Sequence, residues 1–333
     1  MIKAYAAMQP GGQLEPYEYD PGELGADEVE IDVQYCGVCH SDLSVIDSEW
    51  GKMNYPVVAG HEAVGTISML GQNIKHLQLG QTVGLGWHCG YCDACSYCGS
   101  GDHNLCSSTK LTIMGHHGAF ADKVRADATS AVPIPDGIDL QSAGPLFCGG
   151  ITVFNPLVQY DIKPTDRVGV IGIGGLGHIA LNFLNAWGCE VTAFTSSESK
   201  REEALSLGAH HVLHSRDADE IKSARGSFDL IISTVNVKLD WKKFLGTLAP
   251  RGRLHFVGVT LEPLEIPVSA IMSKQLSVSS SPTGSPATMV KMLEFAKLHD
   301  IRPTIEVYRF DDINAAVDRL RSGDARYRVV LER

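Results

Sequence analysis

The pattern of apolar and polar positions differs between the two halves of the chain. Up to about Thr152, short apolar runs are broken by glycine, as in VEIDVQYCGVC, YPVVAGHEAVGTISML and QTVGLGW, which predicts short strands and turns. From about Asp161 onward, apolar runs of strand length alternate with segments of helical periodicity. This alternation indicates βαβ units and a parallel sheet. We therefore expect an α/β protein in which a mostly β region accompanies a doubly wound parallel sheet.

Individual elements can be assigned within the second region. Strands are predicted at Arg167–Ile171, Glu190–Phe194, Asp229–Ser233 and Leu254–Val257, and helices at Leu176–Trp187, Ser199–Leu207 and Trp241–Leu248. After about Pro286, MVKMLEFAKL predicts one more amphipathic helix, and YRVVLE predicts a strand. We find no internal repeat and no low-complexity segment.

Length, composition and charge limit the class of protein. A chain of 333 residues exceeds the size at which a single core keeps growing, so two domains are expected. The net charge of −11 argues against nucleic acid or an anionic membrane as the main partner. No stretch has the length needed to span a bilayer, and the start, MIKAYAAMQPGGQ, has no apolar signal core. With nine cysteines, these features favour a reducing compartment, the cytoplasm.

Four cysteines lie close together in CDACSYCGSGDHNLC, with the spacing C-x2-C-x2-C-x7-C. Thiolates gathered by short loops form the closed tetrahedral pocket of a structural zinc. Disulfides are the alternative, but clustered cysteines in a large chain without a secretory signal favour a metal. Cys89 lies just before the group, and using it would leave another cysteine idle, so we take it as a spare. The predicted ligands are Cys92, Cys95, Cys98 and Cys106.

A glycine-rich segment, VGVIGIGGLGHIA, lies between a predicted strand and a predicted helix. Glycine allows a tight turn and a close approach of the backbone to a pyrophosphate, whose charge then meets the helix N-terminus. The alternative is a glycine turn required only by packing. The strand–turn–helix context favours a dinucleotide site formed by Gly172, Gly174, Gly175, Leu176 and Gly177.

The end of the second strand bears on which dinucleotide is bound. An NAD site usually has Asp or Glu there, hydrogen-bonded to the ribose. This chain has Thr195, Ser196 and Ser197, followed by Lys200. Hydroxyl donors and a cation suit a 2′-phosphate, which a carboxylate would repel, so we expect NADP(H). The alternative is a solvated helix start in which Ser199 and Glu202 form a capping pair.

A second set of metal-ligating residues is spread along the sequence. Cys39 in GVCHSDL and His61 in AGHEAVG each lie near glycine in the strand-rich region, and Cys148 in PLFCGGITVF precedes the dinucleotide region. A single histidine of this kind is more often a structural hydrogen-bonding group. Two thiolates and one imidazole, however, leave a zinc ion with an open coordination position, which is the pattern of a catalytic site.

These motifs, with GIGGLG and in this order, resemble the zinc-dependent alcohol dehydrogenases of the medium-chain dehydrogenase/reductase superfamily. DLSVIDSEWG, GGITVFNPL, EVTAFTSSESK and ARYRVVL are most similar to the cinnamyl-alcohol dehydrogenase branch and its bacterial NADPH-dependent aldehyde reductases. The resemblance implies that Cys39, His61 and Cys148 bind the catalytic zinc. It further implies that Glu62 swings in to replace a departing ligand, and that Asp42 orients the ligand histidine from behind.

The resemblance also implies an architecture and a reaction. A GroES-like, mostly β catalytic domain would comprise residues 1–153 and 287–333, and a Rossmann domain residues 154–286. An aldehyde would be reduced reversibly by NADPH to a primary alcohol, with zinc as the Lewis acid. Relatives are homodimers or homotetramers that pair through the Rossmann sheet edge, which here would be the strand near Leu276–Ser279.

Proton transfer and the substrate pocket are less directly encoded. Ser41 matches the relay hydroxyl of the family, but Ser44 stands where many relatives carry a relay histidine. His40 matches a basic residue that contacts cofactor phosphate, and it is also a candidate proton carrier. Arg328 is a further candidate phosphate contact. Trp50 and Trp87 follow the metal-bearing segments and are candidates to line a mostly apolar pocket for aliphatic or aromatic aldehydes.

Two other functions remain open at this point. One is a zinc-free quinone or enone reductase on the same scaffold, and the other is a non-catalytic NADPH-binding protein. The combined presence of Cys39, His61 and Cys148 argues against both. The remaining cysteines, Cys36 and Cys189, are expected to be packing residues or free thiols. The histidine pairs, His116/His117 and His210/His211, are expected on loops.

Overall fold

The computed structural model describes all residues from Met1 to Arg333. They form two compact units. Unit 1 comprises Met1–Ile151 and Thr283–Arg333, and unit 2 comprises Thr152–Pro282. These boundaries lie a few residues before the predicted ones. None of the helices combines the length and apolar character that crossing a membrane requires.

The main sheet of unit 1 has seven strands and is built around β3, whose residues Val29, Ile31 and Val33 are buried. This period of two in a run rich in β-branched residues is what a strand over a core requires. The order is β16-β17-β3-β4-β5-β9, and β8 also pairs with β3. The strands are β3 (Glu28–Val38), β4 (Ala63–Leu70), β5 (Thr82–Leu85), β8 (Lys123–Asp127), β9 (Val132–Pro133), β16 (Ile305–Arg309) and β17 (Arg328–Glu332).

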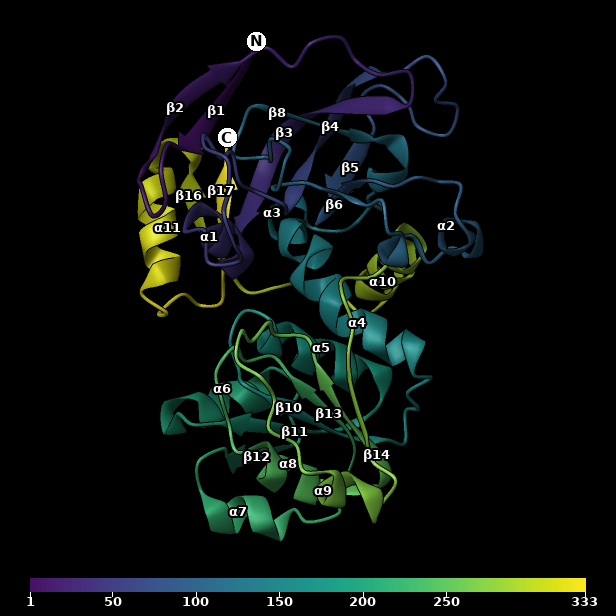
Figure 1. Ribbon diagram of the computed structural model, residues 1–333, viewed down its shortest axis with the longest axis vertical. Helices are drawn as coiled ribbons and strands as arrows, with labels where there is room; N and C mark the ends of the chain where they lie inside the picture. The colour runs from purple at the N-terminus through teal and green to yellow at the C-terminus, as the bar shows by residue number, and fades with distance from the viewer. The chain divides into compact units, whose positions relative to one another are not determined.

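Two small sheets and several helices complete unit 1 (Figure 1). The small sheets pair β1 (Ile2–Ala7) with β2 (Leu14–Tyr19), and β6 (His88–Gly90) with β7 (Lys110–Leu111). The helices are α1 (His40–Ile46), α2 (Ser96–Ser100), α3 (Leu140–Ala143), α10 (Pro286–Leu298) and α11 (Ile313–Arg321), while α4 (Gly149–Gln159) crosses the unit boundary.

The expectation of a single helix and strand after Pro286 is wrong. Besides α10 and β17, this segment contains β16 and α11. In α11, Ile313, Ala316 and Val317 are buried, a spacing of three and four that forms one apolar face. This helix packs on β16 and β17, and both strands belong to the sheet of unit 1 because β17 pairs with β3 and β16 pairs with β17.

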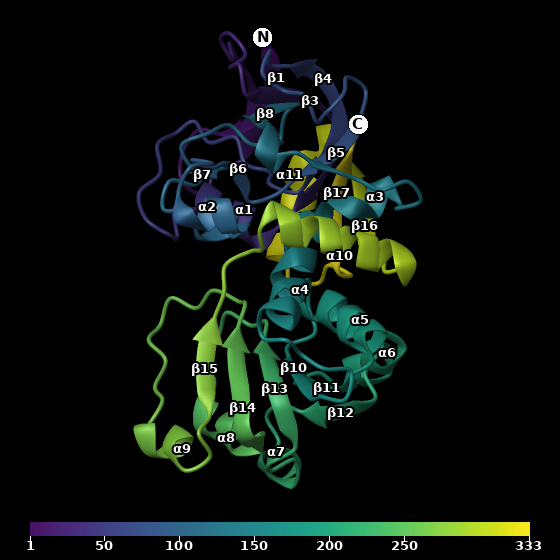
Figure 2. The same cartoon turned by 90° about the vertical axis from the view of Figure 1, so that its right-hand side faces the viewer.

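Unit 2 is a six-stranded parallel sheet in the order β12-β11-β10-β13-β14-β15, with β13, β14 and β15 side by side in Figure 2. This order is that of a doubly wound dinucleotide-binding fold. The strands are β10 (Arg167–Ile171), β11 (Glu190–Thr195), β12 (His211–His214), β13 (Phe228–Ser233), β14 (Leu248–Phe256) and β15 (Ser277–Ser280). The helices are α5 (Gly177–Trp187), α6 (Arg201–Ser206), α7 (Ala218–Ser223), α8 (Trp241–Thr247) and α9 (Val268–Met272).

The predicted elements of unit 2 are present, with two corrections. His211 begins β12 and does not lie on a loop, because it pairs in register with Thr192 of β11. The helix predicted from Ser199 is shorter, since a 3-10 turn at Glu198–Lys200 precedes α6. The central strands read as continuous apolar runs because helices cover both faces of such a sheet.

Candidate active site

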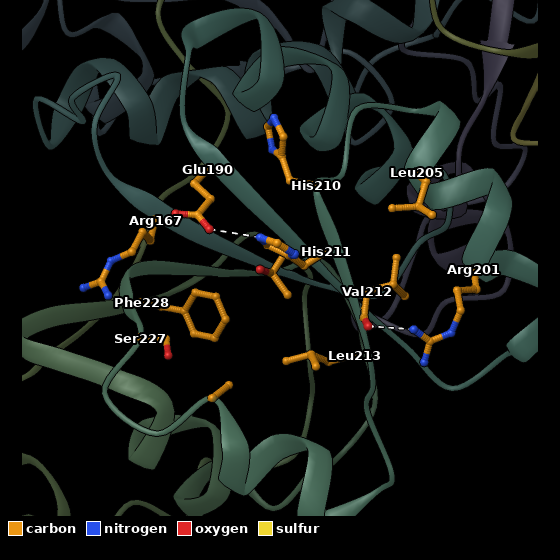
Figure 3. A pocket seen from close by; sticks show the side chains of 12 residues that line it. Arg167, Glu190, Arg201, Leu205, His210, His211, Val212, Leu213, Ser227 and Phe228 are labelled. Carbon is orange, nitrogen blue, oxygen red and sulfur yellow. Dashed lines mark hydrogen bonds and ion pairs between the residues drawn. The ribbon is translucent and has the colours of Figure 1, made fainter.

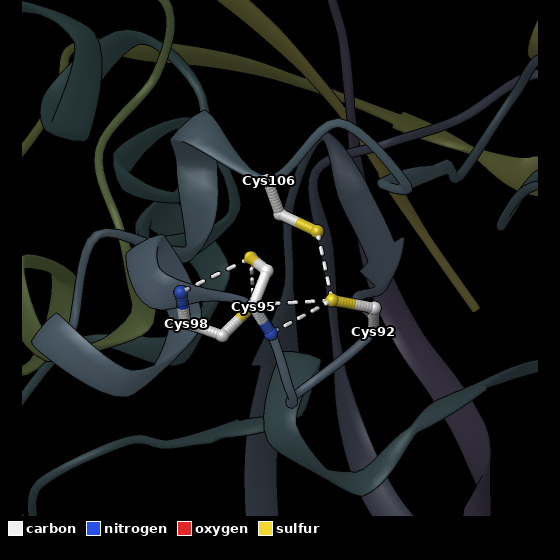
Figure 4. Close-up of side chains that lie close together, drawn as sticks. All are labelled: Cys92, Cys95, Cys98 and Cys106. Carbon is white, nitrogen blue, oxygen red and sulfur yellow. Dashed lines mark hydrogen bonds between the residues drawn. The ribbon is translucent and has the colours of Figure 1, made fainter.

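The four-cysteine loop lies between β6 and β7, and α2 is part of it (Figure 4). Cys92 Sγ lies 3.4 Å from Cys106 Sγ and 3.9 Å from Cys98 Sγ, which is 3.6 Å from Cys95 Sγ. Sulfur atoms 2.3 Å from one zinc ion at tetrahedral corners are about 3.8 Å apart. The four residues therefore fit a closed zinc site.

Backbone N–H groups prepare this loop for negative charge. The N–H of Cys95 points to Cys92 Sγ at 3.4 Å, and the N–H of Cys98 points to Cys95 Sγ at 3.5 Å. The N–H groups of Ala94 and Cys95 lower the pKa of Cys92 to about 6. Because a thiolate, and not a thiol, binds metal, this geometry favours the ligand form of Cys92, whereas burial raises the pKa of Cys98 to about 12.

The remaining cysteines lie apart from this loop's sulfur atoms. Cys89 is buried in β6, outside the metal-ligating groups, and burial raises its pKa to about 12. Cys36 on β3 and Cys189 before β11 are buried too. None of the nine cysteines is in a disulfide.

A second donor cluster, the Cys39 cluster, gathers Cys39, His61, Glu62 and Cys148 from three distant segments. One ligand atom from each lies within 4.8 Å of the others. Cys39 Sγ is 3.9 Å from Cys148 Sγ, and His61 Nε2 is 3.3 Å from Cys148 Sγ. Two sulfurs and one imidazole nitrogen at these separations fit a zinc ion that keeps one position open.

Asp42 on α1 holds two of these donors in place. Its Oδ1 lies 2.8 Å from His61 Nδ1 and accepts the N–H of Gly60, while its Oδ2 accepts the N–H of Cys39. The contact with Nδ1 fixes the proton there and leaves Nε2 as the metal-facing lone pair. Burial lowers the pKa of His61, but the carboxylate of Asp42 and the sulfur of Cys39 together outweigh it and raise that pKa well above its usual value.

The pKa values of the two thiols in the cluster are shifted in opposite directions. A hydrogen bond from Cys148 lowers the pKa of Cys39 well below its usual value, although burial works against this. The same contact, with burial, raises the pKa of Cys148. Two sulfurs this close share one proton, since two uncompensated negative charges repel each other. A bound dication would remove that repulsion.

Glu62 and Arg328 form a fully buried ion pair at the edge of the cluster. Arg328 Nη2 donates to Glu62 Oε1. Burial raises the pKa of Glu62 to about 7, although Arg328 opposes this shift. Sequence reasoning missed the pair, because only the register of β17 against β3 brings Arg328 here. The role of Arg328 as a phosphate contact stays a prediction.

Residues predicted for proton transfer and substrate binding lie around α1. His40 and Ser41 occupy its first turn, with His40 exposed and Ser41 half-buried. The hydroxyl of Ser44 is buried and donates to Glu49 Oε2 at 2.7 Å. It is therefore committed to a structural contact.

Two tryptophans form a chain of ring contacts that begins at His61. The ring of Trp87 meets His61 edge-on at 5.1 Å between centroids, and Trp50 meets Trp87 at 5.8 Å. Both indoles are partly buried against the core of unit 1. An apolar wall thus begins next to the predicted metal ligands.

The glycine-rich segment in unit 2 forms the turn between β10 and α5. Gly172 has φ +89°, and a Cβ on Gly177 would overlap the carbonyl oxygen of Gly172. The first position needs the freedom of glycine, and the second allows the helix to start directly against the strand. Gly174 lies between them with open space around its Cα. Gly175 follows, and Leu176 is the N-cap of α5.

The segment after β11 meets this turn, because β10 and β11 are parallel neighbours whose carboxyl ends lie together. Lys200 Nζ donates to the carbonyl of Ile173 at 2.9 Å. Thr195 is buried and accepts the N–H of Ser197, and Ser196 is exposed. The alternative of a Ser199–Glu202 capping pair is wrong, because α6 begins after Lys200 without a side-chain cap.

Comparisons with known proteins agree with this arrangement. Residues 25–136 match the alcohol dehydrogenase GroES-like domain, and residues 175–297 match the zinc-binding dehydrogenase domain. The chain is 61% identical over 331 residues to aldehyde reductase AdhA of Synechocystis sp., covering 99% of this chain and 98% of the relative. This chain belongs to the zinc-binding alcohol dehydrogenases.

Other members of the family are similar over nearly the whole chain. A probable cinnamyl alcohol dehydrogenase 8A of Oryza sativa is 39% identical, with 98% of this chain and 94% of the relative covered. The solved cinnamyl alcohol dehydrogenase of Sorghum bicolor has a TM-score of 0.96 at 38% identity, covering 99% and 97% of the chains. That of Helicobacter pylori, complexed with NADP(H), has a TM-score of 0.91 at 29% identity and the same coverage.

These findings confirm three predictions. The family resemblance is confirmed, as is the fold class of a GroES-like domain with a Rossmann-type sheet. The chain is an oxidoreductase of the zinc-dependent alcohol and aldehyde type. Its alcohol dehydrogenase relatives act on small alcohol or aldehyde substrates.

Two cavities lie away from both donor clusters. One of about 510 Å³ lies at the amino ends of the strands of unit 2, opposite the dinucleotide turn (Figure 3). Its polar groups pair among themselves, since Glu190 contacts His211 and Arg201 donates to the carbonyl of Val212. Another of about 810 Å³ in unit 1 is lined by Tyr17, Tyr19 and His117 among others.

Proposed function

We propose that this protein is an NADPH-dependent, zinc-dependent aldehyde reductase that also works in reverse as an alcohol dehydrogenase. The observation that carries the proposal is the Cys39 cluster, in which Cys39, His61 and Cys148 converge from three segments with Asp42 behind the histidine. In this proposal residues 1–153 and 287–333 form the catalytic domain, and residues 154–286 bind the cofactor.

The residues of the cluster divide the work of holding and orienting. Cys39, His61 and Cys148 hold the metal, and Asp42 keeps His61 in the tautomer whose Nε2 is free to bind. When bound, zinc supplies a Lewis acid for the carbonyl oxygen and NADPH supplies the hydride. A second zinc at Cys92, Cys95, Cys98 and Cys106 is structural.

Proton transfer is assigned to the first turn of α1. Ser41 is half-buried and lies two residues after the predicted ligand Cys39, so we assign its hydroxyl to pass the proton. Beyond Ser41 the usual outer histidine is absent, and Ser44 is engaged with Glu49. His40 is exposed and is assigned to the cofactor phosphate or to the exchange of the proton with solvent.

The preference for NADPH rests on the end of β11. Thr195, Ser196 and Ser197 offer hydroxyls where a carboxylate would repel a 2′-phosphate, and Lys200 is anchored beside the glycine turn. The relative at 61% identity is named an aldehyde reductase, and a solved relative is complexed with NADP(H), which supports the same assignment. Trp50 and Trp87 suit an aliphatic or aromatic aldehyde.

We further propose a cytoplasmic homodimer or homotetramer. β15 is an edge strand of the sheet of unit 2, where unpaired backbone groups invite a second copy. Exposed apolar side chains lie in and near α9, the helix that precedes this strand: Val259, Leu261, Val268 and Met272. Such residues are typical of an interface between copies.

Metal content and NADPH oxidation, measured together, test the proposal. We expect two zinc ions per chain and oxidation of NADPH with a panel of aliphatic and aromatic aldehydes. Removing one zinc with a chelator should abolish turnover. One retained zinc with no aldehyde turnover would leave the four-cysteine loop standing and contradict the catalytic role of the Cys39 cluster.

The cofactor preference needs its own measurement. We expect kcat/KM for NADPH to exceed that for NADH, and Ser196→Asp to reduce the ratio by about tenfold or more because it places a carboxylate near the 2′-phosphate. Glu198→Gln, a change just outside the predicted contacts, is the control. An unchanged ratio in Ser196→Asp would contradict the assignment.

A further inference from the structure

The side chain of Glu62 crosses a neighbouring strand to reach its partner. β3 lies between β4 and β17 in the sheet of unit 1. Glu62 directly precedes β4, and its carbonyl accepts the N–H of Gly37 at 3.0 Å, so it lies opposite Gly37 on β3. Arg328 is on β17, on the other side of β3. The ion pair between Glu62 and Arg328 therefore spans β3 from one side to the other.

Gly37 is the point on β3 over which this side chain passes. A Cβ at Gly37 would overlap Glu62 Oε2 and lie 2.9 Å from both Cβ and Cδ of Glu62. Its φ is not in the left-handed region, so the backbone does not require glycine here. In a strand, such a glycine marks close approach of another group. Here the approaching group is the carboxylate.

The carboxylate is held at one oxygen only. Oε1 accepts from Arg328 Nη2, whereas Oε2 is buried and has no hydrogen-bond partner. The charge is thus kept beside the sulfur atoms of Cys39 and Cys148, within the 4.8 Å limit of the cluster. If the place above Gly37 were filled, Oε2 would have to leave it. Besides Arg328, which already binds Oε1, the nearest cation would be a metal ion held by the cluster.

We propose that Gly37 and Arg328 are positioning residues that keep the carboxylate of Glu62 beside the metal ligands and out of the open coordination position. This inference rests on the proposed function, because it presumes a metal at Cys39, His61 and Cys148. Because Gly37 has no side chain, the Glu62 carboxylate can stay over β3, and the fourth coordination position is left free for substrate. Arg328 supplies the attraction, and Gly37 supplies the room.

Cobalt(II) substitution tests the proposal without relying on activity. The visible d–d bands of cobalt(II) report the number and type of ligands, and the Cys39→Ala protein, which keeps only the four-cysteine site, provides the blank. Gly37→Ala should shift the bands of the Cys39 cluster through an added oxygen ligand. It should also change the rate of cobalt release to a chelator by about tenfold, as changes around metal ligands typically do.

A second variant, on another strand, distinguishes displacement of the Glu62 carboxylate from a simple loss of stability. Arg328→Met removes the attraction and should produce the same band shift as Gly37→Ala. The double variant Gly37→Ala/Glu62→Gln should restore the bands of the native protein, because an amide is a poor ligand. Gly65→Ala, a strand glycine of β4 whose Cβ would meet the backbone of Asp32, should lose stability without any band shift.

The outcomes distinguish this inference from the proposed function. Native bands and a native release rate in folded Gly37→Ala would overturn the inference. A band shift that persists in the double variant would overturn it too, since Glu62 would not be the added ligand. If the native protein itself binds no cobalt beyond the Cys39→Ala blank, the proposed function fails first.

Discussion

The four-cysteine loop and the Cys39 cluster use similar donor atoms but are assembled in different ways. The loop takes all its sulfurs from a single segment between β6 and β7, and backbone N–H groups are its main internal support. The Cys39 cluster takes its donors from three segments and is supported by buried charged side chains, Asp42 and the Glu62–Arg328 pair.

This difference teaches how a closed and an open metal site are built. Four local thiolates fill a tetrahedron and need little from the rest of the fold. An open site must keep one position free while holding its donors rigidly, and that requires groups from several strands. Four changes test the contrast, and the most disruptive comes first.

The largest effect is expected from Cys39→Ala. Loss of the metal at this cluster removes the Lewis acid, which contributes several kcal/mol, so aldehyde reduction should fall by about a thousandfold or more. Metal analysis should find the zinc of the four-cysteine loop retained. Cys36→Ala, at a buried cysteine of β3 that lies outside the cluster, is the control. Turnover that survives loss of this zinc would show that the metal mechanism is wrong.

A smaller effect is expected from Asp42→Asn. The amide keeps the shape of the side chain but lacks the charge that holds His61 Nδ1–H, so zinc affinity at the Cys39 cluster should fall by about 10–100-fold. Competition with a fluorescent chelator measures it. The zinc of the four-cysteine loop serves as the internal control. If the zinc affinity of the Cys39 cluster is the same in the variant as in the native protein, Asp42 does not have this role.

Cys98→Ser should affect stability more than catalysis. Losing a ligand from the four-cysteine loop should release its zinc and lower the melting temperature by about 5–10 °C, as expected for about 2–3 kcal/mol. The rate of aldehyde reduction should fall less than it does in Asp42→Asn, which weakens zinc binding at the Cys39 cluster itself. Cys89→Ser, at the spare cysteine of β6, should keep both metals. A loss of activity as severe as that of Cys39→Ala would mean that the two sites are not independent.

The smallest effect concerns acid stability near the loop. His88 on β6 meets Tyr91 edge-on at 5.5 Å between ring centroids, and burial lowers its pKa to about 4. An unfolded histidine titrates near pH 6.5, so between these values the unfolded chain binds more protons. This contribution to the free energy of unfolding is complete above about pH 6.5 and is lost as the pH falls toward 4.

The variant His88→Phe removes that titration. Its melting temperature should decline less steeply than that of the native protein between about pH 7 and pH 5, and the difference between the two curves cancels acid effects on the metals. Parallel curves would contradict the assignment. In the Cys39 cluster the shift has the opposite sign, because Asp42 raises the pKa of His61.

The same contrast explains what the sequence could predict. The four-cysteine site follows from spacing alone, because short loops bring neighbouring thiolates together whatever the rest of the chain does. Cys39, His61 and Cys148 could be grouped by residue type as an open zinc site, but no local pattern connects them, and the family resemblance was needed to assign them as the ligands. Their convergence depends on α1, on the segment before β4 and on the turn before α4.

Other features were missed for identifiable reasons. β12 contains His211 and His214, polar residues that masked a short edge strand. α11 shows its apolar spacing clearly, so its omission was an error of reading and not a lack of signal. The partnership of Arg328 with Glu62 depends on the register between β17 and β3, which pattern alone does not specify.

The place of β17 has a consequence for how the protein is made. β17 lies beside β3 in the sheet of unit 1, yet all of unit 2 is translated between them. Unit 2 is contiguous in sequence and can fold while later residues are still on the ribosome. Glu62, in contrast, has no guanidinium partner until β17, which carries Arg328, has been synthesised. The dinucleotide turn can therefore form before synthesis is complete, whereas the charge of Glu62 cannot be balanced by Arg328 until the last strand has been made.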